Sequence, residues 1–457
     1  MAALQPPATR PRSSLRQVIV ASLIGTTIEW YDFFLYGTAA ALVFGKLFFP
    51  RSDPLTGVLQ AFLTYSLGFV ARPIGGLVFG HFGDRIGRKR LLMASLMLMG
   101  VSSCTMGLLP GYAQIGAAAP VLLAALRFVQ GFAVGGEWGG AVLMAGEFGD
   151  ARRRGTWAGW PQVGVPAGNL LAAGVMAVMA ATLSDADFLG WGWRVAFLLS
   201  GVLVAVGWWV RSTLSESPQF EATVAKVTQT REPAPLLQVL KHRPGGILIG
   251  MGLKFGENIS FYILVTFSIA YLGETLHASR QIGLNALLFG SFVEVLTLPL
   301  FAALSDRIGR RTVFTFGALG MAAWIFAFFD LIHSVGAMAV AGAMAVGLLL
   351  HGAMAGPQAA FMAELFPTRY RYTGVSIAYQ VTSIFAGSLA PVIAVALLQR
   401  THSTTAISIY VAAACAVSAI AALMARETKG LSFAEIDSRH GSGRSGGAPM
   451  DAHSPIL

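Results

Sequence analysis

The sequence predicts an all-α polytopic membrane protein whose twelve transmembrane helices form two pseudo-symmetric six-helix bundles. Of its 457 residues, 55% are hydrophobic and only 12% are charged, which is too few charges to cover a water-soluble protein of this size. Apolar runs of about 20 residues, the length that crosses ~30 Å of hydrocarbon, recur along the chain. A basic turn also stands at the same place in each half, as in a duplicated membrane bundle.

The apolar runs define the predicted domains. The twelve predicted spans are roughly residues 17–45, 57–81, 90–110, 119–146, 156–183, 191–211, 245–272, 281–304, 312–331, 335–362, 373–399 and 404–425. The longest internal polar stretch joins spans six and seven, and we expect an amphipathic helix in its middle. The predicted domains are a cytoplasmic N-terminal segment, a first bundle, a cytoplasmic linker, a second bundle and a disordered cytoplasmic tail: residues 1–16, 17–211, 212–244, 245–427 and 428–457.

The basic turn is the most informative motif of the chain. Its copies are GHFGDRIGRKR at 80–90 and SDRIGRR at 305–311, each between the second and third span of its half. The aspartate is expected to cap the next helix or pair with the arginines, and the basic side chains to anchor at anionic headgroups. We therefore predict a cytoplasmic gate that holds the halves together in one conformation. The predicted gate residues of the two copies are Gly80, Asp84, Arg85, Gly87, Arg88, Lys89, Asp306, Arg307, Gly309 and Arg310.

A second internal repeat adds to this gate. Glu147 and Glu364 each close a span, and each precedes an arginine by seven residues, Arg154 and Arg371. We expect these four residues to link helix ends to loops inside the cell rather than to contact substrate.

The positive charge reports topology rather than a polyanionic partner. The net charge is +10, and most of the 32 lysines and arginines fall in the segments that lie inside if the N-terminus is inside. The positive-inside rule then places both termini in the cytoplasm. No nucleic-acid partner is expected.

Glycine and cysteine point to packing rather than chemistry. Several of the 53 glycines recur within spans at four-residue spacing, such as Gly131 and Gly135, which lets helix backbones approach closely in lipid. Cys104 and Cys415 both fall within apolar spans, and no disulfide or zinc spacing occurs. No metal or cofactor is expected, and no nucleophile–base set at the usual spacings indicates an enzyme.

Charges embedded in the first span are candidates for proton coupling, because an ionisable group in hydrocarbon is costly and usually faces a cavity. Glu29 and Asp32 lie three residues apart and share a helix face with Tyr36. Two nearby carboxylates suit reversible proton loading. A structural pair satisfied by a neighbouring arginine or tyrosine is the alternative.

Arg127 and Glu137 are the embedded charges of the fourth span. A buried arginine is permanently charged and holds a carboxylate in a fork, so Arg127 is a candidate for an anionic substrate or for Asp32. Glu137 stands deeper, among glycines. For Arg127 a structural ion pair is the alternative.

The second half carries its own substrate-binding candidates. Lys254 and Glu257 lie one turn apart in span seven, where Gly252 and Gly256 would let a substrate approach the backbone. His351 and Gln358 share a face of span ten, and His351 is a candidate proton relay. Self-neutralisation of the Lys–Glu pair and a packing role for the histidine are the alternatives.

The duplication also relates two opposite charges. Arg72 precedes Asp84 by twelve residues, and Glu294 precedes Asp306 by the same interval. We hypothesise that they line or close the route between the halves; the alternative is local pairing within each half.

Four stretches together resemble the metabolite:proton symporters of the major facilitator superfamily. They are GTTIEWYDFFLY at 25–36, the first basic turn, RFVQGFAVGGEWGG at 127–140, and ELFP at 364–367 followed by RYTG at 371–374. The chain looks most similar to shikimate-transporter-like members and related bacterial inner-membrane metabolite transporters. It departs from the pattern at Ala302, where the second turn motif usually opens with glycine and where less close packing is expected.

This resemblance implies the major facilitator fold, a central cavity that opens alternately to each side, and uptake driven by the proton gradient. It implies a monomer in the bacterial inner (plasma) membrane whose partners are protons, lipid and a small molecule. Family substrates include carboxylates such as citrate and shikimate, and zwitterions such as proline and betaine. We expect proton-coupled uptake of a small organic acid, with a zwitterionic osmolyte, export and antiport as alternatives.

Overall fold

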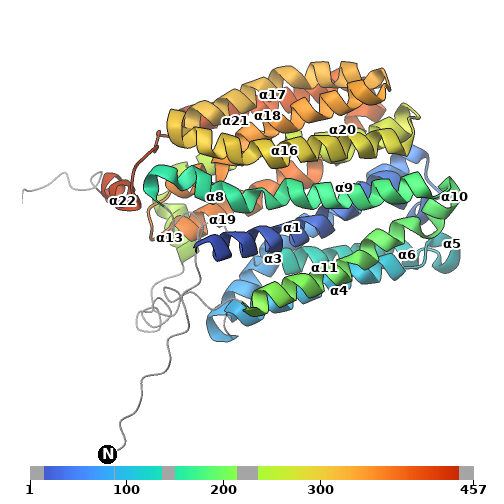
Figure 1. Ribbon diagram of the computed structural model, residues 1–457, viewed down its shortest axis with the longest axis horizontal. Helices are drawn as coiled ribbons and strands as arrows, with labels where there is room; N and C mark the ends of the chain where they lie inside the picture. Colours follow the sequence, from blue (N-terminus) through green and yellow to red (C-terminus); the bar gives the residue numbers. More distant parts are fainter. Residues whose placement is uncertain (1–14, 87, 136–149, 214–234, 442–457) are drawn as a thin grey trace, which may run out of the picture.

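The computed structural model describes residues 15–86, 88–135, 150–213 and 235–441, and all regular structure within these ranges is helical. Within the described residues, helices coincide with each of the twelve predicted spans, except that the second part of span 119–146 is not described (Figure 1). Nine helices of the described part are long and apolar enough to cross a membrane, and two more, Met93–Leu108 and Ala118–Val134, are apolar but shorter. Large apolar side chains such as Leu77, Leu300 and Trp209 are exposed, as expected for a surface that faces lipid.

The first half contains the rods built from residues 15–213. Its helices are α1 (Leu15–Ala39), α2 (Gly45–Phe48), α3 (Pro54–Ile86), α4 (Arg88–Leu108), α5 (Tyr112–Ile115), α6 (Ala118–Val134), α8 (Arg154–Gln162), α9 (Gly164–Thr182), α10 (Asp185–Asp187) and α11 (Trp193–Thr213). Short helical turns of other pitch, η1 (Ala40–Phe44), η2 (Ala151–Arg153) and η3 (Phe188–Gly192), connect some of them.

The second half is built in the same way, with a linker helix, α13, before it and a tail helix, α22, after it. Its helices are α13 (Pro235–His242), α14 (Pro244–Tyr262), α15 (Ser268–Ala270), α16 (Arg280–Ile308), α17 (Arg310–His333), α18 (Ala337–Glu364), α19 (Arg371–Thr382), α20 (Leu389–Thr401), α21 (Thr404–Met424) and α22 (Phe433–Gly441). The π-helical turns η4 (Ile263–Phe267), η5 (Tyr271–Thr275) and η6 (Ser383–Ser388) interrupt its rods.

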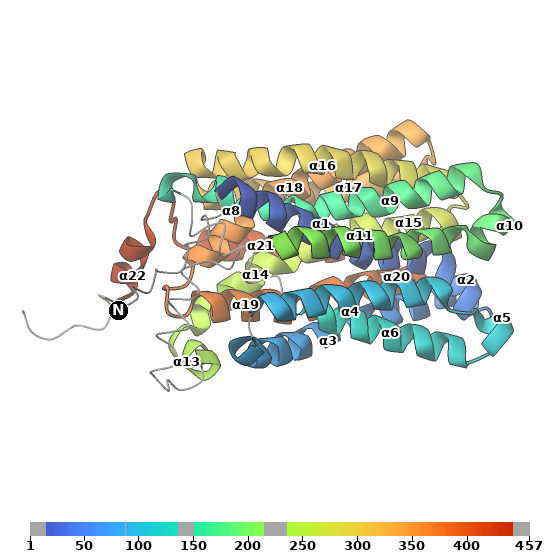
Figure 2. The ribbon, with the colours of Figure 1, turned by 60° about the horizontal axis from the view of Figure 1, so that its bottom comes forward.

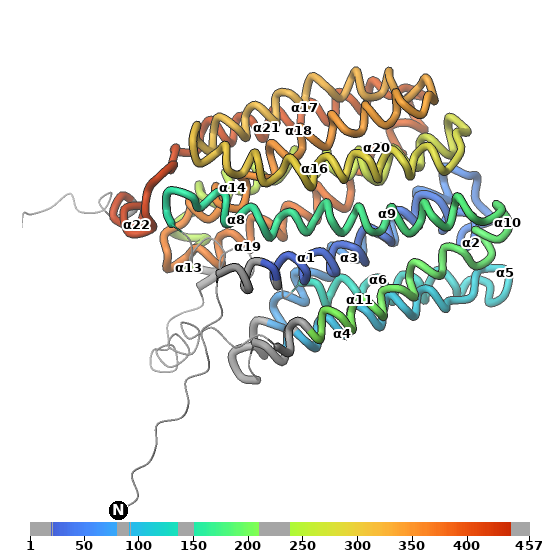
Figure 3. Tube along the Cα trace, in the orientation of Figure 1, coloured from blue at the N-terminus to red at the C-terminus, as the bar shows by residue number. Residues whose placement is uncertain are grey.

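The two halves lie side by side, with their long helices running roughly in the same direction (Figures 1 and 2). In Figures 1 and 2, α3, α4 and α6 lie on one side of the molecule and α16, α17 and α18 on the other, with α1, α8 and α9 between them. The tube in Figure 3 follows the chain from the first group to the second. Helices α8 and α9 pack on α16, α8 also packs on α18, and α3 packs on η6 and α20. These contacts form the interface that contains the site.

Glycine allows the closest helix contacts inside the first half. A Cβ atom on Gly75 would lie 1.8 Å from the carbonyl oxygen of Phe132, and one on Gly131 would lie 2.0 Å from that of Gly68. Because neither clash can be relieved without moving a backbone, α3 and α6 require glycine here.

Ala302 does not loosen its helix crossing, contrary to our expectation. A Cβ atom on Gly159 would come within 2.5 Å of the Ala302 Cβ, and one on Gly356 within 2.9 Å of the Ala302 backbone nitrogen. The glycines of α8 and α18 therefore accommodate the extra methyl group.

The prediction of a disordered tail is wrong for residues 433–441, which form α22. Ile436 is buried, and the Phe433 ring lies against the guanidinium groups of Arg154 and Arg371, at 3.7 and 3.4 Å from ring centroid to Cζ. The buried Ile436 and the Phe433 ring therefore hold α22 against the rest of the protein, although the composition of this segment predicts disorder. Of the linker, α13 is described: its Gln238 accepts hydrogen bonds from Arg369 and Tyr370. The middle of the linker lies outside the described residues.

Candidate functional site

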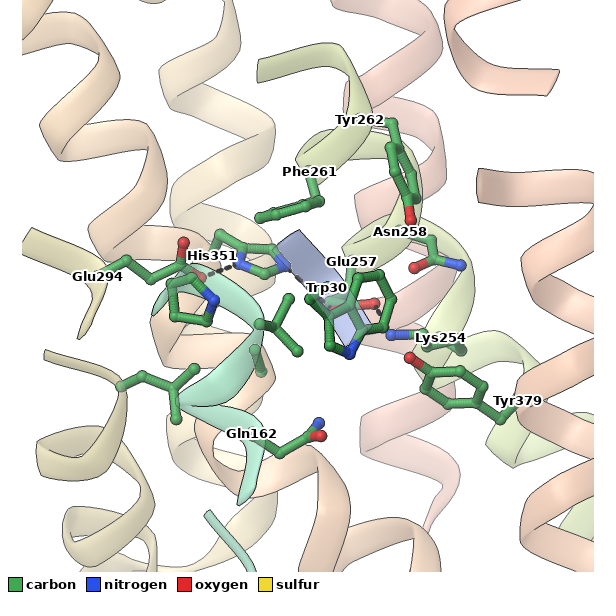
Figure 4. Close-up of a pocket in the computed structure, with 14 residues that line it drawn as sticks. Trp30, Gln162, Lys254, Glu257, Asn258, Phe261, Tyr262, Glu294, His351 and Tyr379 are labelled. Carbon is green, nitrogen blue, oxygen red and sulfur yellow. Dashed lines mark hydrogen bonds and ion pairs between the residues drawn. The ribbon is translucent and has the colours of Figure 1, made fainter. Parts of the chain in front are cut away.

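A narrow polar pocket lies between the two halves, near the middle of the bundles (Figure 4). The first half contributes side chains from α1, α8 and α9, and the second half from α14, α16, α18 and α19. Its lining residues are Trp30, Gln162, Val165, Pro166, Lys254, Glu257, Asn258, Phe261, Tyr262, Glu294, Leu298, His351, Ala355 and Tyr379. The pocket therefore combines charged, amide and aromatic groups, as small-molecule sites do.

Lys254 and Glu257 form an ion pair on α14 within this pocket. The Lys254 Nζ atom lies 2.7 Å from Glu257 Oε2, and both side chains are almost fully buried. Nζ also donates to Gln358 Oε1 at 3.3 Å and lies 4.3 Å from the Tyr379 ring centroid. The sequence-predicted residues Lys254, Glu257 and Gln358 are thus neighbours.

His351 connects this pair to Glu294. Its Nε2 lies 3.1 Å from Glu257 Oε1, and its Nδ1 lies 2.5 Å from Glu294 Oε1. In Figure 4 the imidazole stands between the two carboxylates, and the Phe261 ring lies 4.6 Å away between centroids. Helices α14, α16 and α18 therefore bring four embedded ionisable groups into one chain, Lys254–Glu257–His351–Glu294.

The glycines of α14 do not expose backbone to this pocket. A Cβ atom on Gly256 would lie 2.5 Å from the carbonyl oxygen of Ala414, and one on Gly252 would lie 2.6 Å from the Ala421 Cβ. Both glycines face α21, where Ser418 Oγ accepts a hydrogen bond from the Gly256 nitrogen. The expectation that a substrate approaches the helix there is wrong, because close helix packing occupies that face.

The charges of the first half form a separate network. Arg127 is fully buried; it donates to Gln130 Oε1 and, at 3.4 Å, to the carbonyl oxygen of Tyr65. Its guanidinium lies over the rings of Phe33, Tyr36 and Tyr65, with Cζ 4.1, 4.5 and 4.5 Å from their centroids.

Asp32 belongs to this same network and accepts a hydrogen bond from Ser200. Gln130 donates to Ser103, which also neighbours Asp32, whereas Tyr36 is hydrogen-bonded to Thr64. Neither Asp32, Tyr36 nor Arg127 lines the pocket.

Arg72 and Glu294 are not joined in this conformation. Glu294 is bonded to His351, whereas the Arg72 guanidinium lies 4.1 Å from the Phe33 centroid and 5.2 Å from that of Trp30. Trp30 lines the pocket, so Arg72 lies directly behind a pocket wall. Glu29 is buried on α1, within electrostatic range of Tyr379.

The second copy of the basic turn contacts the first half. The Asp306 carboxylate accepts hydrogen bonds from the backbone nitrogens of Gly155 and Thr156, both at 2.8 Å, and from Thr156 Oγ1 at 2.7 Å. Arg310 donates to the same carboxylate at 2.6 Å. Asp306 thus binds the N-terminus of α8, where exposed N–H groups favour an anion.

Glu364 makes the second contact between halves at this end. It accepts from Arg154 Nη1 at 2.8 Å and lies 3.4 Å from Arg310 Nε. Arg371 instead donates to the carbonyl oxygen of Ala363 at 3.1 Å. We call these contacts of Asp306, Glu364 and Arg154 the latch.

The structure describes the other predicted gate residues only in part. Gly309 has a φ of 106°, which favours glycine, and the backbone nitrogens of Arg310 and Arg311 after it donate to Glu427; the Arg307 carbonyl accepts from Lys429 at 2.6 Å. Gly80 lies within α3. Glu137, Glu147 and Gly87 lie outside the described residues, as do the side chains of Asp84, Arg85, Arg88 and Lys89.

The halves also meet at the opposite end of the bundles. Asp185 pairs with Arg280, and Lys46 Nζ lies 2.9 Å from Glu274 Oε1. Ion pairs thus join the halves at both ends of the bundles, and the pocket lies between these ends.

Comparisons with known proteins agree on the family. Residues 17–238 match the model of the sugar (and other) transporter family, and residues 252–442 match that of the major facilitator superfamily. The inner membrane metabolite transport protein YhjE of Escherichia coli is 42% identical over 92% of this chain and 96% of its own length. The chain belongs to the major facilitator superfamily. It is accordingly a polytopic membrane transporter rather than an enzyme.

Further relatives share its sequence, and a solved structure shares its fold. The shikimate transporter of E. coli is 38% identical over 91% of this chain and 96% of its own length, and the proline/betaine transporter of Salmonella typhimurium is 32% identical over 91% and 84%. The xylose transporter XylE from E. coli, in an inward-open conformation, superposes with a TM-score of 0.72 at 16% identity, covering 93% of this chain and all of that one. This last similarity shows the shared fold.

Sequence reasoning missed several residues of the pocket. Trp30 and Tyr379 carry no charge, so a search for embedded charges did not select them. Trp30 nevertheless stands beside Glu29 in one of the stretches that resemble the family. Gln162 could have been found as a polar residue within span five.

Proposed function

We propose that this transporter takes up a small organic acid together with protons by alternating access. The observation that carries the proposal is Lys254, a buried ammonium in the pocket between the halves, whose position suits a substrate carboxylate. A buried charge retained at a cost in hydrocarbon marks a substrate or ion path. Acids in the same pocket supply places for the coupling proton.

The polar lining favours a hydroxylated acid. Gln162, Asn258 and Tyr379 offer amide and hydroxyl groups around Lys254, and these could bond to substrate hydroxyls. The similarity to the shikimate transporter supports this class of substrate. We therefore put shikimate-like hydroxy acids first and dicarboxylates second.

A zwitterionic osmolyte is the second candidate. Trp30, Phe261, Tyr262 and Tyr379 line the pocket, and aromatic faces bind quaternary ammonium groups. Glu257 would pair with such a cation while Lys254 holds its carboxylate. The similarity to the proline/betaine transporter supports this alternative.

The surroundings of the transporter follow from the same proposal. We propose a bacterial inner membrane location with the latch end and both termini in the cytoplasm, in accord with the positive-inside distribution. The proton gradient is the energy source, no further cofactor is needed, and a monomer contains the whole pocket.

Uptake into proteoliposomes tests the proposal. Purified protein is reconstituted and an inward proton gradient is imposed, and the uptake of radiolabelled shikimate, citrate, 2-oxoglutarate, proline and betaine is measured. Accumulation of an organic acid that a protonophore abolishes is expected. Accumulation of betaine alone would favour the second candidate, and uptake that is indifferent to the protonophore would exclude symport. Loss of preloaded acid against the gradient would indicate export or antiport.

A further inference from the structure

The charges around the pocket are balanced. Both ring nitrogens of His351 face carboxylate oxygens, Nε2 toward Glu257 at 3.1 Å and Nδ1 toward Glu294 at 2.5 Å (Figure 4). Only the doubly protonated imidazolium can donate to both. The chain Lys254–Glu257–His351–Glu294 then holds two cations and two anions, and its net charge is zero.

The other groups that the structure describes near the chain leave this balance unchanged. Among the described residues, Tyr262, Tyr379 and Cys415 are further titratable groups within electrostatic range of Glu257. Beyond them, Tyr379 is in range of one basic side chain, Arg72 on α3, and one acidic side chain, Glu29 on α1. The residues of α8 and α9 that face the pocket, Gln162, Val165 and Pro166, carry no charge.

A carboxylate substrate would upset this balance. A carboxylate that takes over Lys254 must displace the carboxylate now paired with it, which belongs to Glu257. This buried position would then hold one unpaired negative charge, which is strongly unfavourable in a low-dielectric interior.

We propose that Glu257 carries the coupling proton, which it accepts when the substrate carboxylate displaces it from Lys254. This inference rests on the proposed function. One proton from water in the open cavity forms an O–H bond on Glu257, the Lys254–Glu257 ion pair becomes a pair between Lys254 and the substrate, and no other bond changes. On the other side Glu257 returns the proton to water, pairs with Lys254 again and expels the acid.

His351 and Glu294 are positioning residues in this scheme. The Glu294–His351 pair keeps its charges throughout and holds Glu257 Oε1, so that Oε2 alone exchanges between Lys254 and the proton. Glu294 lies a helix away from Lys254, on α16, and is bonded to His351 rather than to the ammonium. It is therefore not the carboxylate that the substrate displaces.

The scheme makes uptake of a monocarboxylate electroneutral, because one anion and one proton move together. The test measures labelled shikimate uptake into proteoliposomes under a pH gradient without membrane potential, and under a potassium-diffusion potential at equal pH. In the wild-type protein the pH gradient drives accumulation and the potential does not. Accumulation driven by the potential alone would overturn the proposal, and this measurement depends on no variant.

Glu257→Gln supplies the second test, because the amide keeps the shape of the protonated acid but cannot release a proton. Shikimate exchange without a gradient is expected to persist, accumulation driven by the pH gradient to be lost, and transport to become sensitive to potential. Glu274→Gln is the matched control, since Glu274 also pairs with a lysine, Lys46, but at the end of the bundles. Its uptake should stay electroneutral and proton-coupled.

The outcomes separate the two proposals. If the wild-type protein accumulates shikimate or another acid of the panel and Glu257→Gln still follows the pH gradient, the role of Glu257 is wrong and the proposed function stands. If the wild-type protein accumulates no organic acid, the proposed function fails and the role of Glu257 fails with it.

Discussion

The two halves share a fold and a basic turn, yet they use their embedded charges differently. In the first half, Asp32 and Arg127 are enclosed within their own bundle by Ser200, Gln130 and a set of aromatic rings. In the second half, Lys254, Glu257 and His351 face the pocket between the halves. Burial in hydrocarbon marks both sets as costly, but of these residues only those of the second set line the pocket. Duplication has therefore preserved the scaffold and not the site.

The largest expected effect is the loss of binding in Lys254→Gln. Truncating one partner of a buried charge pair costs about 2–5 kcal/mol, or roughly 30- to 4,000-fold in affinity. Binding of labelled shikimate to the purified protein measures it. Lys46→Gln, which breaks the Lys–Glu pair at the end of the bundles, should leave the affinity nearly unchanged. Equal affinities for Lys254→Gln and the wild-type protein would remove the contrast between the halves.

Arg127→Gln should lower stability more than affinity. The substitution removes a buried guanidinium from Gln130 and three rings, and breaking such a network costs about 3 kcal/mol. Thermal unfolding of the purified protein should show a clear decrease, while the shikimate affinity of the folded fraction changes little. A folded variant that no longer binds shikimate would show that Arg127 belongs to the substrate site, as the sequence analysis predicted.

Asp306→Asn should weaken the latch by about 1–3 kcal/mol, because the charged acceptor for α8 and Arg310 is lost. Spin labels across the two halves at the latch end should report a larger population with a long distance. Asp185→Asn, which removes the pair with Arg280, should open the opposite end instead. Identical distance distributions in the two variants would show that neither contact governs its end.

Phe433→Ala should have the smallest effect, about 1–2 kcal/mol for two cation–π contacts, in the same direction as Asp306→Asn. The same spin labels measure it. Phe433→Leu keeps an apolar side chain without a ring, so it separates the contribution of apolar packing from that of the cation–π contacts. An unchanged distance distribution in Phe433→Ala would show that α22 contacts the latch without stabilising it.

Much of the fold could be predicted because the bilayer imposes it. Backbone groups in hydrocarbon must be satisfied within a helix, so length and hydropathy located every rod. The tail was misjudged because the order of α22 depends on two arginines from other parts of the chain, Arg154 and Arg371.

The site was predicted in part. Lys254, Glu257, Glu294, His351 and Gln358 stood out because polar groups are rare in apolar spans, but that criterion selected Asp32 and Arg127 equally. The same criterion missed Trp30 and Tyr379. They line the pocket only because of the direction in which their side chains point, which the sequence does not give.

The sequence by itself therefore determined the membrane location, the twelve helices, the duplication and the set of costly embedded charges, because each follows from local composition and spacing. Only the tertiary structure decided which of those charges meet. Helical periodicity assigns a residue to a face of its own helix, whereas the packing of α18 against α14 and α16, and of α8 and α9 against α16, determines what that face touches. The basic turn shows this most directly: its spacing indicated a gate, and its partner, the N-terminus of α8, lies in the other half.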